Sequence, residues 1–194
     1  IGGTNFRIGM VSEHGELLHF EKKPSSILTS GNNAMDALTE QITSYIKMYG
    51  ANVNIKAVAI GFPSIVSKDK KVLYSTPNLA GFNNINLKDP MESALGLPVF
   101  IDRDVNFLLQ NDIRQLGLDR CQTILGFYVG TGFGNAIYIE GKFYSGKNGA
   151  AGELGHIPLY GVEETCTCSN VGCAETRCSG KHLEAIVREH FPQT

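Results

Sequence analysis

Two glycine-rich turns, each next to strand-like sequence, constrain this chain most. Gly2-Gly3-Thr4 precedes the alternating residues 5–10, and Gly130-Thr131-Gly132-Phe133-Gly134 separates two apolar runs at 123–129 and 135–140. Backbone N–H groups approach a phosphate chain closely only where no Cβ intervenes. A glycine turn alone is also typical of an ordinary hairpin. As a pair, each with a threonine hydroxyl, the turns favour a phosphate site.

The order of elements predicts an α/β fold. Neither turn fits the two common phosphate motifs, which lead from a strand into a helix. After an antiparallel start, helical spacing at 33–49 is followed by a buried strand at 56–62. A short helix at 89–95, a strand at 99–102 and a helix at 105–116 come next. Beyond the second turn, a helix opens at Gly149, residues 158–179 are coil, and helical spacing resumes at 181–190.

Composition excludes several classes of function. The chain has 194 residues, 42% hydrophobic and 19% charged, with a net charge of −2, as in a globular protein that binds small molecules. Its basic residues are not clustered, so we expect no nucleic-acid partner. No apolar run is long enough for a membrane span and no signal peptide is evident, so we expect a cytoplasmic protein. Because the chain opens on Ile1 without an initiator methionine, we also expect residues upstream.

Three further motifs resemble one family. They are Ala151-Gly152-Glu153-Leu154-Gly155-His156, then Cys166-x-Cys168-x-x-x-Gly172-Cys173-x-Glu175, then Ser179-Gly180. Together with the two turns, and in this order, they resemble the ROK family of sugar kinases and sugar-responsive repressors over nearly the whole chain. The resemblance implies an actin-like ATPase (ribonuclease H-like) fold. It places an N-terminal domain at 1–140 and the start of a second domain, with a zinc-binding segment, at 141–194, the rest of that domain being absent.

Within the family, three segments are similar to the D-allose kinases. They are 61–70, 75–79 and 103–106. Family glucokinases usually have Gly after the proline where this chain has Ser64, and Asn-Asp where it has Arg103-Asp104. The resemblance therefore implies ATP-dependent phosphorylation of the 6-hydroxyl of D-allose, with Mg²⁺. The implied partners are a hexose and ATP, and the implied assembly is a homo-oligomer, most simply a dimer.

The resemblance also implies roles for single residues. Asp104 matches the general base that accepts the proton of the attacking hydroxyl, although Asp is equally a favoured helix N-cap. Carboxylates and imidazole suit a polyol, whose hydroxyls they bind in pairs. The alternatives are that Glu153 is a solvated helix residue and that Arg103 pairs with a surface carboxylate. The implied sugar ligands are Glu153, His156, Glu175, Asn78, Arg103 and Gly61. The implied phosphate ligands are Gly2, Gly3, Thr4, Gly130, Thr131, Gly132 and Gly134.

The cysteines favour a metal over a disulfide framework. Four of the five crowd into 166–178, and Cys166, Cys168 and Cys173 with His156 make a closed tetrahedral set for structural Zn²⁺. His156 would bind the metal by one ring nitrogen and offer the other to the sugar. The alternative is a set of unligated cysteines in a reducing compartment. Ser169 stands where the family commonly has Gly, Cys178 is spare, and Cys121 is expected in the core.

Two other functions remain open. A sugar-sensing ROK repressor would carry the same domain behind a DNA-binding segment, but it has no chemical need for two phosphate turns and Asp104. We therefore favour the kinase hypothesis. Glucokinase, fructokinase and N-acyl-hexosamine kinase are the alternatives within it. A stand-alone zinc interaction module is weaker still, because the metal set occupies little of the chain.

Overall fold

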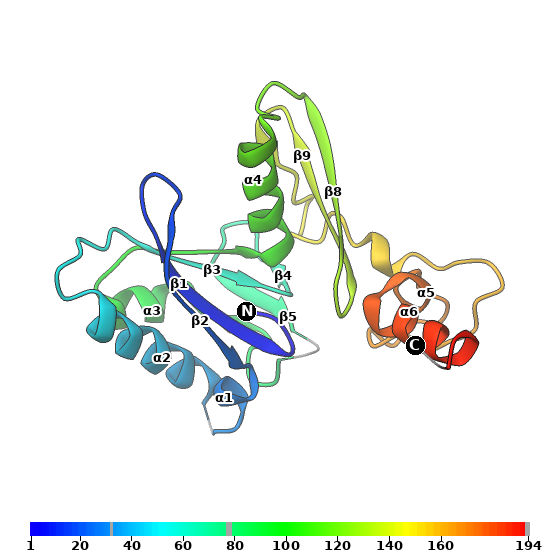
Figure 1. The fold of residues 1–194 in the computed structure, drawn as a ribbon, viewed down its shortest axis with the longest axis horizontal. Coiled ribbons are helices and arrows are strands. Elements are labelled where there is room, and N and C mark those ends of the chain that lie inside the picture. Colours follow the sequence, from blue (N-terminus) through cyan, green and yellow to red (C-terminus); the bar gives the residue numbers. More distant parts are fainter. Residues whose placement is uncertain (32, 77–78, 193–194) are drawn as a thin grey trace. The chain divides into compact units, whose positions relative to one another are not determined.

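The computed structural model describes residues 1–31, 33–76 and 79–192, which form two compact units (Figure 1). The first is Ile1–Asp104 and the second is Val105–Thr194. Both units contain helices and strands, as the sequence predicts. The division after Asp104 marks compact units, whereas the boundary predicted between 140 and 141 concerns domains of the family fold and stays a prediction. No helix of the described part combines the length and apolarity needed to cross a membrane.

The first unit opens with the expected antiparallel pair. Strand β1 (Asn5–Val11) pairs with β2 (Leu17–Pro24). A short helix α1 (Ser26–Thr29) leads to α2 (Ala34–Tyr49), which begins where the Asn33 side chain accepts hydrogen bonds from two backbone N–H groups of the first turn. Helix α2 is tied to β2, because the Tyr45 hydroxyl donates to the His19 carbonyl at 2.7 Å.

A parallel strand pair forms the other half of this unit. Strand β3 (Val58–Phe62) runs parallel to β7 (Val99–Arg103), and Gly61 lies opposite Asp102. The helix between them, α3 (Lys88–Leu95), ends at Gly96 in the left-handed conformation that glycine adopts without strain. Because the strands are parallel, their carboxyl ends meet at one edge. This edge carries Gly61 and Arg103.

Three short strands were not predicted. Strands β4 (Ile65–Val66), β5 (Val72–Ser75) and β6 (Ile85–Asn86) form a small antiparallel sheet. Runs of two to four residues are too short for alternation to be visible in sequence. The core beneath these elements is apolar and fully buried at its centre: Leu28, Leu38, Phe62, Leu73, Phe82, Leu87, Met91 and Val99.

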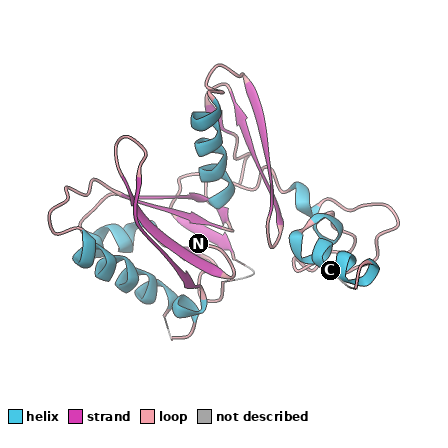
Figure 2. Cartoon of the chain, in the orientation of Figure 1, coloured by secondary structure: helices cyan, strands magenta, loops and turns pink. Residues whose placement is uncertain are grey.

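The second unit is a helix on a hairpin (Figure 2). Helix α4 (Asp104–Leu116) is followed by β8 (Thr123–Val129) and β9 (Phe133–Ile139), which pair along their whole length, and by β10 (Lys142–Phe143). Val105, Leu109 and Ile113, on one face of α4, are buried in one cluster with Ala136 of β9. The predicted helix and strands are thus confirmed.

The remainder of the unit differs from the prediction in three respects. The expected helix from Gly149 is a single 3₁₀ turn, η1 (Leu154–His156), because Gly149 and Gly152 have φ values of 81° and 87°, outside the helical region. The expected coil at 158–179 ends in a short helix, α5 (Glu175–Cys178), before α6 (Gly180–His190). Cys121, expected in the core, is exposed in the loop after α4.

Candidate active site and metal centre

The first glycine turn is anchored from outside by Ser25. The Gly2 N–H donates to the Asn5 carbonyl at 2.9 Å and closes the turn ahead of β1. The Ser25 hydroxyl donates to the Gly2 carbonyl at 2.5 Å, and the Ser25 N–H donates to the Thr4 carbonyl at 3.0 Å. Ser25 is 2% exposed, so these bonds are shielded from water. Ser25 belongs to no sequence motif that predicts this role.

Asp104 begins α4 directly after the carboxyl end of β7, and its side chain is half-buried. Asp104 lies within electrostatic reach of Ile1, the residue that precedes the first turn. Arg103 is buried, at 9% exposure, and is not a solvated surface residue.

An ion pair anchors strand β7, which ends directly before Asp104. An Asp102 carboxylate oxygen accepts from the Lys70 ammonium group at 2.7 Å and from the Arg103 N–H at 2.8 Å. Lys70 lies in the turn between β4 and β5, with a φ of 59°. The ion pair thus fastens this turn to β7 two residues before Asp104. A single lysine among 17 basic residues gives no sequence signal for such a role.

The second glycine turn joins β8 to β9. The Gly130 N–H donates to the Gly132 carbonyl at 2.9 Å, and Thr131 is exposed at the tip. Within the described residues, the N–H groups of Thr131 and Gly132 donate to no other group. The Phe133 N–H, in contrast, donates to the Glu175 carboxylate at 2.8 Å. Two amides at the tip are therefore available to an anion, and the third is occupied.

The segment with Glu153 and His156 packs directly on β9. The Leu154 N–H donates to Asn135 Oδ1 at 3.1 Å, and a Cβ at Gly155 would overlap the Phe133 carbonyl oxygen. Asn135 is fully buried, and its Nδ2 has no partner in the described part of the chain. The predicted sugar ligands are thus fixed next to the second turn. Asn135 is a functional candidate that the sequence analysis missed, because an asparagine inside a strand gives no motif.

Four side chains form a candidate metal site: His156, Cys166, Cys168 and Cys173, whose ligand atoms all lie within 4.8 Å of one another. His156 Nδ1 is 3.6 Å from Cys166 Sγ, and Cys168 Sγ is 3.6 Å from Cys173 Sγ. Tetrahedral zinc with Zn–S bonds of about 2.3 Å separates its sulfur ligands by about 3.8 Å. The donor set and its spacing therefore fit a tetrahedral metal ion.

The electrostatics of the cluster also favour a cation. Burial and the neighbouring Cys168 and Cys166 raise the pKa of Cys173 to about 12. Burial also raises the pKa of Cys168, but hydrogen bonds from the Asn170 backbone and the neighbouring thiols outweigh it and lower that pKa overall. Thiolates crowded in this way repel one another unless a positive charge lies among them. A metal ion supplies that charge and removes the thiol protons.

The two ring nitrogens of His156 lie near different groups. Its Nδ1 points to Cys166, and its Nε2 lies 3.7 Å from the Glu153 carboxylate. A metal on Nδ1 would leave the proton on Nε2, which could then donate to a carboxylate or a hydroxyl. The structure therefore brings together the metal set, Glu153 and Glu175, whose carboxylate is 3.8 Å from Cys166 Sγ.

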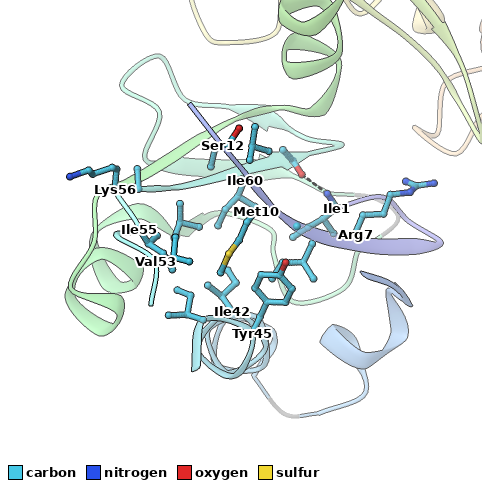
Figure 3. Close-up of a pocket in the computed structure, with 18 of the residues that line it drawn as sticks. Ile1, Arg7, Met10, Ser12, Ile42, Tyr45, Val53, Ile55, Lys56 and Ile60 are labelled. Atoms are coloured by element: carbon cyan, nitrogen blue, oxygen red, sulfur yellow. Dashed lines mark hydrogen bonds between the residues drawn. The ribbon is translucent and has the colours of Figure 1, made fainter. Parts of the chain in front are cut away.

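The cavity of about 640 Å³ in the first unit is a different place (Figure 3). It lies between β1, α2 and β3, with Met10, Ile42 and Tyr45 among the side chains that line it. Of the predicted site residues it includes only Gly61, whose carbonyl accepts from the Ile1 amino group at 2.7 Å. Asn78, the remaining predicted ligand, lies outside the described residues.

Comparison with known proteins shows the family of the chain. The model of the ROK family matches residues 1–193. The chain is 30% identical over 194 residues to a glucokinase of Streptomyces coelicolor, covering 100% of this chain and 59% of that protein. It is 27% identical over 206 residues to an N-acetyl-D-glucosamine kinase of Vibrio cholerae, covering 98% and 65%.

Among solved structures, a ROK family glucokinase from Streptomyces griseus in complex with glucose and AMPPNP superposes with a TM-score of 0.83 at 27% identity. The match covers 100% of this chain and 61% of that one. The chain thus spans about three fifths of the length of these two glucokinases. The likeness confirms the predicted actin-like ATPase fold.

Proposed function

The chain belongs to the ROK family, and we propose that the protein containing it is an ATP-dependent hexose kinase. One observation carries the proposal. The second unit brings a glycine turn, two candidate sugar-binding carboxylates and a histidine of the candidate metal site into one set of direct contacts. Such a set is what phosphoryl transfer to a polyol needs, since that reaction depends on positioning and on charge.

In this proposal the sugar is recognised by Glu153, His156 and Glu175. Carboxylates accept from pairs of neighbouring hydroxyls, and the His156 Nε2–H donates to one of them. Polar contacts of this kind discriminate between epimers better than apolar packing does. Arg103, Gly61 and Asn78 are proposed as further walls of the sugar site. Asp104 accepts the proton of the 6-hydroxyl as that oxygen attacks the terminal phosphate of ATP.

The two glycine turns are proposed to hold the phosphates of ATP. The amides of Thr131 and Gly132 are available at the second turn, and the first turn, at Gly2, Gly3 and Thr4, is held in shape by Ser25. Mg²⁺ neutralises charge on the phosphates when the nucleotide is bound. Zn²⁺ is the metal proposed for His156, Cys166, Cys168 and Cys173, because three thiolates and one imidazole in tetrahedral spacing favour it over Mg²⁺ or Ca²⁺.

D-Allose is the proposed substrate. The support is the pair of departures from the family glucokinase pattern at Ser64 and Arg103, both of which are buried, at 8% and 9% exposure. A buried arginine at the corner that carries Asp104 offers only donors, where the asparagine typical of glucokinases would both donate and accept. We propose that this change selects the orientation of the 3-hydroxyl, which distinguishes allose from glucose.

A sugar-responsive repressor is the second candidate. The ROK family includes such proteins, and they share the sugar-binding fold. The kinase is preferred because Asp104 and both glycine turns are present and the amides at the second tip are available. A sensor needs no base and no phosphate site.

The test is a coupled ADP-release assay of the full-length, zinc-loaded protein with D-allose, D-glucose, D-fructose, N-acetyl-D-glucosamine and N-acetyl-D-mannosamine. The proposal expects ATP-dependent turnover with the highest kcat/KM for D-allose. A different preferred hexose would overturn the substrate but keep the kinase. Binding of a hexose without any ADP release would favour the repressor.

A further inference from the structure

A side chain at position 132 would meet a carboxylate rather than the backbone. Gly132 does not lie in the left-handed region, so its φ is open to any residue. The three atoms nearest to a Cβ built at this position all belong to the Glu175 carboxylate, and the closest oxygen would overlap it. By contrast, a Cβ at Gly130 would meet nothing within 4 Å. Gly132 therefore makes room for Glu175.

The Glu175 carboxylate occupies this space and forms a hydrogen bond with the turn. Its Oε2 accepts a hydrogen bond of 2.8 Å from the Phe133 N–H, 42 residues earlier in the chain. Phe133 is the first residue of β9, directly after the tip. A hydrogen bond to a charged acceptor is stronger than one between neutral groups. The carboxylate thus fixes the point at which the turn enters the strand.

A second contact holds the other end of the same turn. The Gly180 N–H, at the start of α6, donates to the Gly130 carbonyl at 2.8 Å, and a Cβ at Gly180 would lie 2.6 Å from that oxygen. Glu175 is the first residue of the short helix α5, and Gly180 is the first residue of α6. Residues 175–180 therefore form hydrogen bonds with both ends of the turn.

The position of Glu175 is set in turn by the metal segment. Cys173 is two residues earlier, and the Ala174 N–H donates to the Ile157 carbonyl at 2.9 Å, next to His156. These bonds fix the start of α5 relative to the metal ligands. The hydrogen bond from Phe133 to Glu175 therefore depends on where the metal segment places the start of α5.

We propose that Glu175 is a positioning residue for the phosphate turn as well as a sugar ligand. In this proposal the second turn binds nucleotide with full affinity only while the Glu175 carboxylate accepts the hydrogen bond from the Phe133 N–H, a contact that we call the brace. This inference rests on the proposed function. The Glu175 carboxylate occupies only the Phe133 N–H, and the N–H groups of Thr131 and Gly132 donate to no group in the described part of the chain. Loss of the brace weakens nucleotide binding even when no sugar is present, which a pure sugar ligand would not do.

The test measures AMP-PNP binding to the full-length, zinc-loaded protein by calorimetry with Mg²⁺ and without sugar. We expect Glu175→Ala to weaken binding about tenfold. Glu175→Gln keeps an amide oxygen that can accept from Phe133 and should restore most of the affinity. Glu184→Ala removes an exposed carboxylate on α6, paired there with Arg188, and serves as the matched control. Zinc content and thermal midpoint check that each variant is folded.

A double-mutant cycle separates the brace from a general loss of structure. Gly132→Ala displaces the carboxylate and should weaken AMP-PNP binding as Glu175→Ala does. The double variant should bind no more weakly than Glu175→Ala alone, because the clash is gone with the carboxylate. Unchanged affinity in Glu175→Ala, or fully additive losses in the double variant, would overturn the inference. If the wild type binds no nucleotide, the proposed function fails instead.

Discussion

His156 Nδ1 lies 3.6 Å from Cys166 Sγ, while Nε2 of the same ring lies 3.7 Å from the Glu153 carboxylate. One histidine thus joins the metal cluster to the candidate sugar site. In enzymes with such an arrangement, the metal fixes both the tautomer and the orientation of the ring. We therefore predict that sugar recognition depends on a metal ion bound by His156, Cys166, Cys168 and Cys173.

The first prediction concerns that ion. The purified full-length protein should contain about one zinc ion per chain, because three thiolates and one imidazole complete a tetrahedral set. Cys173→Ser should lose the metal and, with it, hexose binding. Elemental analysis and calorimetry with the sugar measure both. Cys121→Ser, at an exposed cysteine outside the cluster, is the control and should keep both. A folded, zinc-free wild type would refute the metal site.

The second prediction concerns the loop between the cysteines. Ser169 has a φ of 73°, in the left-handed region where a side chain costs about 1 to 2 kcal/mol. Ser169→Gly relieves that strain but frees the unfolded chain, so it should stabilise the zinc-loaded protein by roughly 0.5 to 1 kcal/mol. Chemical denaturation measures the difference. Ser93→Gly, inside α3, should destabilise instead. Equal losses in both variants would count against the strained loop.

The third prediction concerns the first glycine turn. Ser25→Ala removes the hydroxyl that donates to the Gly2 carbonyl, a loss of about 1 kcal/mol or roughly fivefold in binding. We expect the KM for ATP to rise by this factor while the KM for the sugar stays nearly constant. Steady-state kinetics with each substrate varied show the split. Ser26→Ala, at the exposed neighbour, should change neither value; a rise in the sugar KM alone would remove Ser25 from the phosphate site.

Much of the fold and of the candidate site could be predicted from local sequence patterns. The long elements, such as α2 and the β8–β9 hairpin, were predicted because each repeats its apolar period over many residues. The candidate metal set was predicted from residue type and spacing, and the structure brings its four side chains together. The two glycine turns were singled out as candidate phosphate sites because glycine permits close approach. In each case a local pattern carries the information.

Other features could not be predicted, because they depend on contacts between distant residues. Ser25 and Asn135 act on backbone groups 19 or more residues away, and neither belongs to a motif. The reason for glycine at 132 also differs from the one expected: the sequence suggests close approach of phosphate, whereas the structure places the Glu175 carboxylate there. Short strands and the 3₁₀ turn η1 were missed because tertiary packing, not periodicity, determines them.

The fourth prediction concerns the choice of sugar. Arg103→Asn should lower the preference for D-allose over D-glucose by about 1 to 3 kcal/mol, the range of one or two hydrogen bonds to a bound hydroxyl. The ratio of kcat/KM for the two sugars measures it. Arg114→Asn, at an exposed position in the last turn of α4, should leave the ratio as it is. An unchanged ratio in Arg103→Asn would mean that this arginine does not contact the sugar.

The central claim is that Asp104 is the general base of a hexose kinase, and the measurement that tests it most directly is the turnover of Asp104→Asn. In the full-length, zinc-loaded enzyme, this variant should bind the hexose with nearly wild-type affinity, while kcat falls by about a hundredfold or more, as is typical for the loss of a general base. Asp119→Asn, in the loop after α4, should keep full turnover. A folded Asp104→Asn variant with wild-type kcat would contradict the claim and leave Asp104 only the role of a helix cap.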